Sequence, residues 1–184
     1  GLADLEVLGL TTTSDKSRVF SATRTGVYEW DAVNDEWVSI NENLPAFFTQ
    51  YGMLAAASSG SQDYLLFGDT NGKFLYRKDL SGTNNWTTQN SSFAINGSRV
   101  ESFAARTHND IYLGTQGLGI FRSTNGGASW LDSNNEIDEM QFNDMILSDD
   151  GSRTVIAAQQ HLYLYDNYGN EWSRVDLPGA SDHK

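Results

Sequence analysis

The sequence predicts an all-β protein built from four repeated units of four short strands. Glycine is frequent, with 17 among 184 residues, whereas proline occurs only 2 times. The glycines fall between short apolar runs, which is typical of brief strands joined by tight turns. With 39% hydrophobic residues, the chain can bury a sizeable core. We therefore expect residues 1–184 to form a single domain.

An apolar run that ends in a small residue occurs four times. The small residues Ala22, Gly68, Gly114 and Ala158 are 46, 46 and 44 positions apart. A turn and a second apolar or aromatic run follow each of them, which predicts a hairpin. Because small residues let backbones approach closely, we expect neighbouring units to meet there. The runs are Val19–Ala22, Leu65–Gly68, Ile111–Gly114 and Val155–Ala158.

A tryptophan recurs after each hairpin and opens a last short strand. These tryptophans are Trp37, Trp86, Trp130 and Trp172. A further apolar run precedes each hairpin, so every unit has four strands in roughly 45 residues, which is typical of a propeller blade. We predict a β-propeller of four four-stranded antiparallel blades, either as a closed four-bladed ring or as part of a larger propeller. The alternative is an ordinary β-sandwich with accidental periodicity. The predicted blades span approximately 5–46, 47–98, 99–140 and 141–178.

Residues 123–130, Ser-Thr-Asn-Gly-Gly-Ala-Ser-Trp, resemble the Asp box, Ser-x-Asp-x-Gly-x-Thr-Trp, of sialidases, sortilin-type receptors and photosystem assembly factors. Asn125 replaces the Asp, and the resemblance recurs more weakly at 165–172. In that family the box joins the third and fourth strands of a blade. The resemblance implies that Asn125 bonds its own turn, that Gly127 takes a positive φ and that Trp130 packs between sheets. It implies a fold and not an activity, because many activities share this repeat.

Charge and composition exclude several classes of partner. The chain carries 24 acidic and 12 basic residues, a net charge of -12, and its cations are scattered, so we expect no nucleic-acid partner. No run approaches the roughly 20 apolar residues that span a bilayer, so we expect no membrane insertion. Cysteine is absent, which excludes disulfides and thiolate zinc. An acidic surface rich in Ser, Thr and Asn favours a periplasmic or secreted location.

The sequence does not favour an enzyme. Sialidases have three clustered arginines, a tyrosine nucleophile paired with an acid, and about six blades. The eight arginines here show no such cluster, and the family's Arg-Ile-Pro signature is missing. The alternative is a fragment of an Asp-box glycoside hydrolase, whose mark would be two carboxylates beside a deep pocket. We expect no cofactor and no metal site, although the acidic turns at 31–36 and 149–151 leave calcium open.

We expect a ligand to bind on the face formed by the turns between the second and third strands. These tips carry polar residues at equivalent positions of successive blades, and the predicted ligand-binding residues are Arg24, Asn71, Gln116, Gln160 and His161. Segments between blades add apolar residues that look exposed, namely Phe47, Phe48, Tyr51, Phe93, Met140 and Phe142. Rings beside amide and arginine donors suit a protein, peptide or glycan ligand. The alternative is that the rings begin inner strands that pack between blades. The blades are also expected to associate with a second copy or with further blades.

Overall fold

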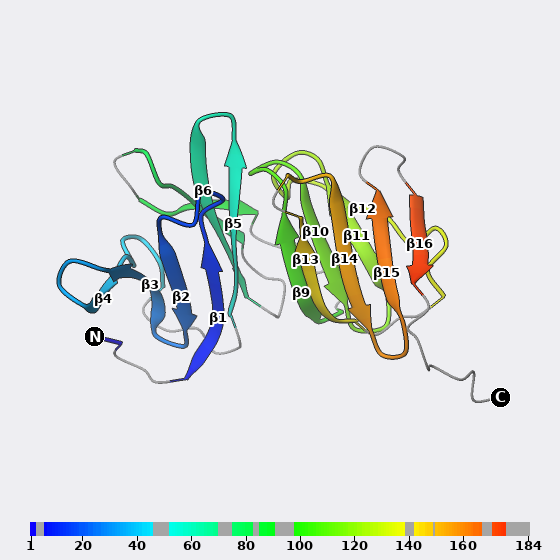
Figure 1. Ribbon diagram of the computed structural model, residues 1–184, viewed down its shortest axis with the longest axis horizontal. Coiled ribbons are helices and arrows are strands. Elements are labelled where there is room, and N and C mark those ends of the chain that lie inside the picture. The colour runs from blue at the N-terminus through cyan, green and yellow to red at the C-terminus, as the bar shows by residue number, and fades with distance from the viewer. Residues whose placement is uncertain are drawn as a thin grey trace.

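A computed structural model of the chain describes residues 1–2, 6–45, 52–69, 75–82, 85–90, 98–138, 142–148, 150–166 and 171–175. Every regular element among these residues is a β-strand. The strands form four separate four-stranded sheets, and in each sheet the strand neighbours follow chain order and pair antiparallel. The prediction of an all-β fold with four propeller blades is confirmed (Figure 1).

The first two blades have strands of four to eight residues. The first consists of β1 (Val7–Thr12), β2 (Val19–Thr23), β3 (Gly26–Asp31) and β4 (Glu36–Ser39). The second consists of β5 (Gly52–Ser59), β6 (Gln62–Asp69), β7 (Leu75–Asp79) and β8 (Thr87–Asn90).

The third and fourth blades repeat this order. The third consists of β9 (Val100–Ala105), β10 (Ile111–Thr115), β11 (Gly119–Ser123) and β12 (Leu131–Asp132). The fourth consists of β13 (Phe142–Leu147), β14 (Arg153–Ala158), β15 (Leu162–Asp166) and β16 (Glu171–Val175).

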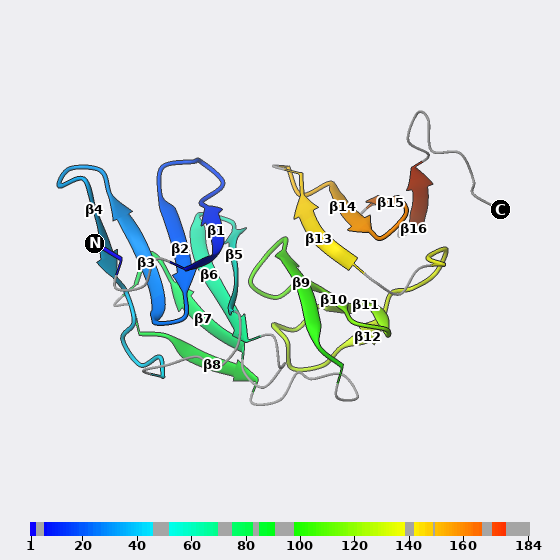
Figure 2. The same cartoon turned by 90° about the horizontal axis from the view of Figure 1, so that it is seen from below.

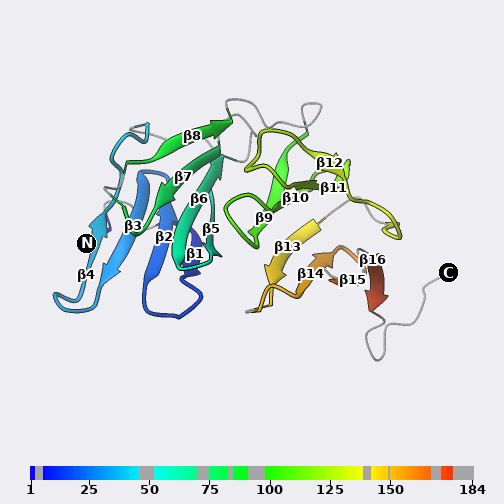
Figure 3. The same cartoon turned by 90° about the horizontal axis from the view of Figure 1, so that it is seen from above.

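The first strand of each blade lies on the inside of an arc. β1 packs against β5, β5 against β9, and β9 against β13. Figure 2 and Figure 3 place the first and fourth blades at the two ends of this arc, with β4 and β16 pointing to opposite sides. The described strands therefore form an open arc and not the closed four-bladed ring, which was one of the two predicted arrangements.

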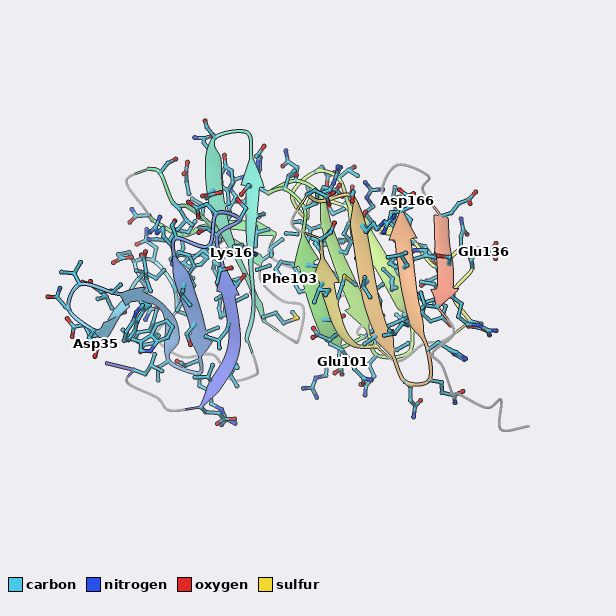
Figure 4. All side chains as sticks on the ribbon, viewed as in Figure 1. Lys16, Asp35, Glu101, Phe103, Glu136 and Asp166 are labelled. Carbon is cyan, nitrogen blue, oxygen red and sulfur yellow. The ribbon has the colours of Figure 1, made fainter. Side chains whose placement is uncertain are left out.

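Apolar side chains fill the space between successive blades. Phe20 and Val27 of the first blade pack with Leu65 and Phe67 of the second. A second cluster joins the second and third blades, and Figure 4 shows Phe103 between these two sheets. The third cluster joins the third and fourth blades and includes five aromatic side chains, namely Tyr112, Phe142, Tyr163, Tyr165 and Trp172.

The repeated small residue lies where blades approach each other, as expected. A Cβ added at Gly114 would lie 3.2 Å from the Cβ of Phe142 on the next blade's inner strand and would also meet the Ser102 hydroxyl. The strand pairing shifts directly after Ala22 and after Gly114. In the fourth blade the corresponding shift follows Ala157, so Ala157 occupies this position and not Ala158.

Candidate functional site

The turns between second and third strands lie at one end of the sheets. In Figure 1 the β2–β3, β10–β11 and β14–β15 turns are at the lower end, and the β5–β6 turn is at the upper end. The structure thus brings Arg24, Gln116, Gln160 and His161 to the same end of three different blades. Asn71 lies outside the described residues.

Arg24 and Gln116 are exposed residues on turns that are held firmly. Arg24 forms an ion pair with Glu6, with 2.9 Å between Nε and Oε2. The backbone N–H of Gln116 donates to the Arg99 carbonyl at 2.8 Å, and the Gln116 carbonyl accepts a hydrogen bond from the Ser98 hydroxyl at 2.6 Å. These bonds tie the tip of the third blade to the segment that enters that blade.

The fourth blade presents Gln160 and His161 in its turn. Gln160 is exposed, and His161 is half-buried with its ring edge-on to Tyr163 at a centroid distance of 6.4 Å. The Ala158 N–H donates to the His161 carbonyl at 2.9 Å and closes the turn. Gln160 therefore lies at the surface, whereas the His161 ring packs against Tyr163 of β15.

The prediction that Phe142 is exposed is wrong. It is only 3% exposed, because it begins β13 and packs into the cluster between the third and fourth blades. The alternative interpretation, in which such rings begin inner strands, holds for this residue. The other apolar residues expected beside the tips, Phe47, Phe48, Tyr51, Phe93 and Met140, lie outside the described residues.

The turn at 123–130 has the internal hydrogen bonds that the Asp-box resemblance implied. The Asn125 Oδ1 accepts bonds from the Ser129 N–H and the Ser123 hydroxyl, both at 2.9 Å. The Gly127 N–H donates to the Ser123 hydroxyl at 2.9 Å, and the φ of Gly127 is 88°. Trp130 packs against the cluster between the second and third blades. These residues stabilise the fold.

This turn lies at the end of the sheet opposite the tips. The Gly126 N–H donates to the Asn109 carbonyl at 3.0 Å, and Asn109 belongs to the turn that enters β10 from the other end. Of the second predicted box, residues 167–170 lie outside the described residues, but Trp172 is buried against Tyr165 at a centroid distance of 4.7 Å.

An arginine ties each of two blades to the blade that follows. In the first blade Arg18 donates to both carboxylate oxygens of Glu29, at 2.6 and 2.8 Å, and its Nη1 donates to the Leu80 carbonyl of the second blade at 3.1 Å. In the third blade Arg122 binds Asp110, and its Nη1 reaches the Tyr165 hydroxyl of the fourth blade at 3.3 Å.

Two shallow hollows lie beside these arginines, each between two blades. The first, of about 290 Å³, is lined by Arg18, Glu29, Ile40, Glu42, Lys78, Leu80 and Asn85. The second, of about 240 Å³, is lined by Arg122, Thr124, Leu131, Asp132, Ser133, Asn135, Tyr165 and Trp172. Sequence reasoning named neither arginine as a contact residue, because the groups that they reach in the next blade, at Leu80 and Tyr165, lie 62 and 43 positions away in the sequence.

The carboxyl groups with shifted pKa values accept hydrogen bonds that stabilise the fold. Burial alone would raise the pKa of Asp110, but hydrogen bonds from Arg122 and Arg106 outweigh it and hold that pKa below its usual range. Asp15 and Asp150 each accept hydroxyl and backbone bonds within a turn, which lowers each pKa to about 2. Among the described residues no group of three or more His, Asp or Glu side chains could hold a metal ion.

In two blades an asparagine that follows the fourth strand binds the start of the third strand through its side-chain amide. Sequence reasoning missed this contact. The Asn41 Oδ1 accepts a bond from the Val27 N–H at 2.7 Å, and the Asn134 Oδ1 accepts one from the Ile120 N–H at 2.6 Å. In both blades a glycine, Gly26 or Gly119, lies against the amide, and an added Cβ would collide with it. The signal was available in the sequence, since each asparagine follows its glycine by 15 positions.

The fold and its turns define a β-propeller blade array, and solved structures support that class. No protein-family model and no curated protein matches the sequence. A GH74 xyloglucanase from Xanthomonas campestris superimposes with a TM-score of 0.58 at 17% identity, over 92% of this chain and 30% of the enzyme's. The structure of U3-55K superimposes with a TM-score of 0.62 at 14% identity, over 95% of this chain and 53% of that chain. The extracellular domain of a protein described as a one-component system from B. thetaiotaomicron superimposes with a TM-score of 0.61 at 15% identity. This match covers 96% of this chain and 24% of that chain.

These similarities show the fold alone. The chain spans between 24% and 53% of the length of these three structures. Among the described residues no helix has the length and apolar character needed to cross a membrane.

Proposed function

We propose that the chain is a non-catalytic recognition or assembly module that binds a protein, peptide or glycan through its tip face. We use this name for the face formed by the turns that carry Arg24, Gln116 and Gln160. The observation that carries the proposal is the shared position of these exposed polar side chains at one end of three blades. Loops set on a rigid scaffold are common binding sites.

The scaffold beneath the tips is rigid enough for this role. Thr23 and Thr115, the last residues of β2 and β10, are fully buried. The Thr115 hydroxyl donates to the Gly119 carbonyl across its turn at 2.7 Å. A ligand that binds these turns would therefore meet a backbone that needs little ordering, which favours affinity.

The charges of the described residues favour binding over catalysis. A glycoside hydrolase with two carboxyls needs one whose pKa is raised, so that it can act as the acid. The described carboxyls with shifted pKa values are all lowered, by turn hydrogen bonds or by arginines.

One observation favours the alternative, a fragment of a glycoside hydrolase. Glu29 and Glu42 line the same hollow. However, Glu29 is held by Arg18, and Glu42 lies 3.2 Å from the Lys78 ammonium, so both carboxylates already neutralise a cation. We therefore keep the binding module as the proposal.

The proposal also includes the type of propeller, an Asp-box propeller, and the location of the protein, which is periplasmic or secreted. The hydrogen bonds around Asn125 support placing the chain among Asp-box propellers. The acidic, cysteine-free composition and the likeness to an extracellular domain support a periplasmic or secreted location.

The test is a glycan array and a peptide and lysate pull-down, run in parallel with two matched variants. The double variant Arg24→Ala/Gln116→Ala removes one cation and one amide from the tip face. The double variant Lys16→Ala/Asn109→Ala removes the same groups from exposed turns at the opposite end of the same two blades. Each ligand retained by the unmodified chain is then measured against both variants.

We expect the tip variant to lose at least about tenfold in affinity, roughly 1.4 kcal/mol, and the control to bind as the unmodified chain does. Equal binding by both variants, or no retained ligand of either class, would remove the tip face from consideration. Release of reducing sugar from a bound glycan would favour the hydrolase instead.

A further inference from the structure

The indole N–H of Trp172 is a buried donor without an acceptor. Trp172 is 4% exposed, and among the described residues its Nε1 has no hydrogen-bond partner. Buried tryptophan N–H groups usually find a partner, because a buried donor that is left unpaired is costly. Trp172 is also one of the residues that line the second hollow, between the third and fourth blades. The unpaired donor therefore belongs to a side chain that a molecule in this hollow would touch.

The corresponding tryptophan of the second blade has its partner. The Trp86 Nε1 donates to the carbonyl of Ile40 in the first blade at 2.6 Å. Ile40 and Ser133 are equivalent, since each directly follows the fourth strand of its blade and donates its N–H to the second residue of the third strand. Ser133 lines the second hollow together with Trp172. This hollow therefore includes the residue whose counterpart supplies the acceptor between the first two blades.

The neighbour of the indole differs between the two cases. Tyr165 has the place in the fourth blade that Lys78 has in the second, as the fourth residue of the third strand. The Lys78 ammonium lies 6.0 Å from the centre of the Trp86 ring, whereas the Tyr165 ring packs on the Trp172 indole at a centroid distance of 4.7 Å. The Tyr165 hydroxyl is in turn held by Arg122. The indole thus packs on a fixed aromatic ring in the fourth blade, and there its N–H does not meet a backbone carbonyl of the described residues.

The polar lining of the second hollow suits a molecule with several hydroxyl groups. Thr124 and Ser133 carry hydroxyls, and Asn135 carries an amide, so all three can both donate and accept. Asp132 adds a carboxylate that only accepts. Thr124, Asp132 and Asn135 are exposed, whereas the Trp172 N–H is buried. A hydroxylated ligand can satisfy both the donors and the acceptors of this set.

Charge and size narrow the class further. The Arg122 guanidinium is already paired with the Asp110 carboxylate at 2.8 Å, so it does not supply a free positive charge for an anion. Leu131, which is 70% exposed, gives the hollow one apolar side. The volume of about 240 Å³ equals about eight water molecules at roughly 30 Å³ each, which is enough for one small ring but not for an extended ligand. A neutral sugar ring, with hydroxyl edges and an apolar face, matches all three features.

We propose that the second hollow binds one neutral sugar residue, and that a hydroxyl oxygen of the sugar accepts the hydrogen bond from Trp172 Nε1. The exposed Thr124 and Asn135 side chains then bind other hydroxyls, and Leu131 contacts the apolar face of the ring. None of the tip-face residues lines this hollow, so the site is separate from the one under the proposed function.

The first measurement is proton–nitrogen correlation NMR of the five tryptophan indole groups, titrated with glucose, galactose, mannose, xylose and N-acetylglucosamine. The Trp172 signal is identified by its loss in Trp172→Phe. We expect one of these sugars to shift this signal and to slow its exchange with solvent. The Trp86 signal should stay in place, because its N–H is already bonded to Ile40. A panel in which no sugar moves the Trp172 signal, or moves it only together with that of Trp86, would overturn the proposal.

Matched variants at the two hollows test the location. Thr124→Val and Asn135→Ala should each raise the dissociation constant of the bound sugar about fivefold, which is the loss of one hydrogen bond between neutral groups. Asn85→Ala is the control, since Asn85 lines the first hollow and all three residues are exposed. The tip variant Arg24→Ala/Gln116→Ala should also bind the sugar as the unmodified chain does. Unchanged affinity in both variants of the second hollow would overturn the site, and a loss confined to the tip variant would assign the sugar to the tip face instead.

Discussion

Arg122 binds the Asp110 carboxylate with two hydrogen bonds, from Nε to Oδ1 at 2.8 Å and from Nη2 to Oδ2 at 3.0 Å. Asp110 directly precedes β10, and Arg122 lies opposite the second residue of that strand. Arg18 and Glu29 occupy the same two positions in the first blade with the charges exchanged. The ion pair therefore recurs in these two blades, with the acidic and the basic residue exchanged between the two positions.

We predict that Asp110→Asn lowers the free energy of unfolding by about 3 kcal/mol, because it leaves two arginines without their shared buried partner. The Asp110 side chain is 7% exposed, whereas that of Glu29 is 25% exposed. Glu29→Gln should therefore cost less, about 1 kcal/mol. Urea unfolding followed by tryptophan fluorescence measures both values, and equal losses would contradict the argument from burial.

The repeat architecture could be predicted because it depends on local patterns. Apolar runs of strand length, polar turns and the spacing of tryptophans such as Trp86 are visible in one sequence, and each has a local cause. The same holds for Asn125, whose side-chain hydrogen bonds join residues at most four positions apart.

Contacts between blades could not be predicted in the same way. Arg122 reaches Tyr165 across 43 positions, and Arg18 reaches Leu80 across 62. The spacing differs between the two contacts, and the arginine precedes the second strand in one blade but lies on the third strand in the other, so no periodic signal marks these pairs. Phe142 was misplaced for a related reason, because an aromatic residue that begins an inner strand reads like a loop residue until the next blade is seen to cover it.

We predict that Gly127→Ala is more destabilising than Gly117→Ala. Both glycines have nearly the same dihedral angle, with φ of 88° and 86°, so both substitutions carry a backbone cost of about 1 kcal/mol. An added Cβ would lie 2.5 Å from Leu75 Cδ2 at Gly127 but would meet nothing within 4 Å at Gly117. The difference, about 2 kcal/mol, measures how tightly the turn packs on the second blade in thermal or urea unfolding. Two equal values would mean that this packing is loose.

We predict that Asn134→Ala costs about 2 kcal/mol, because the buried Ile120 N–H loses its acceptor. The neighbouring Asn135 is the matched control, since it is exposed. Asn135→Ala should change stability by less than about 0.5 kcal/mol. Amide hydrogen exchange at Ile120 gives a local readout, and unchanged protection in Asn134→Ala would contradict the assigned role.

We predict that Asp15 and Asp150 contribute to stability only above strongly acidic pH. Each accepts bonds from a hydroxyl and a backbone N–H of its own turn: Thr13 and Ser17 for Asp15, Ser148 and Ser152 for Asp150. These bonds lower each pKa to about 2, against about 3.9 in the unfolded chain.

Because the folded pKa lies below the unfolded pKa, this contribution is fully present above about pH 4 and disappears as the pH falls toward about 2. The variant Asp15→Asn/Asp150→Asn has no carboxyl to titrate at either turn. Its free energy of unfolding should therefore fall less steeply with decreasing pH than that of the unmodified chain over this window. It should still fall to some extent, because other acids with a lowered pKa, such as Asp110, remain in the variant. Urea unfolding at intervals from pH 5 to pH 2 measures both profiles. Parallel profiles would show that the turn hydrogen bonds do not persist in solution, because an Asn side chain cannot reproduce the proton linkage of a carboxylate.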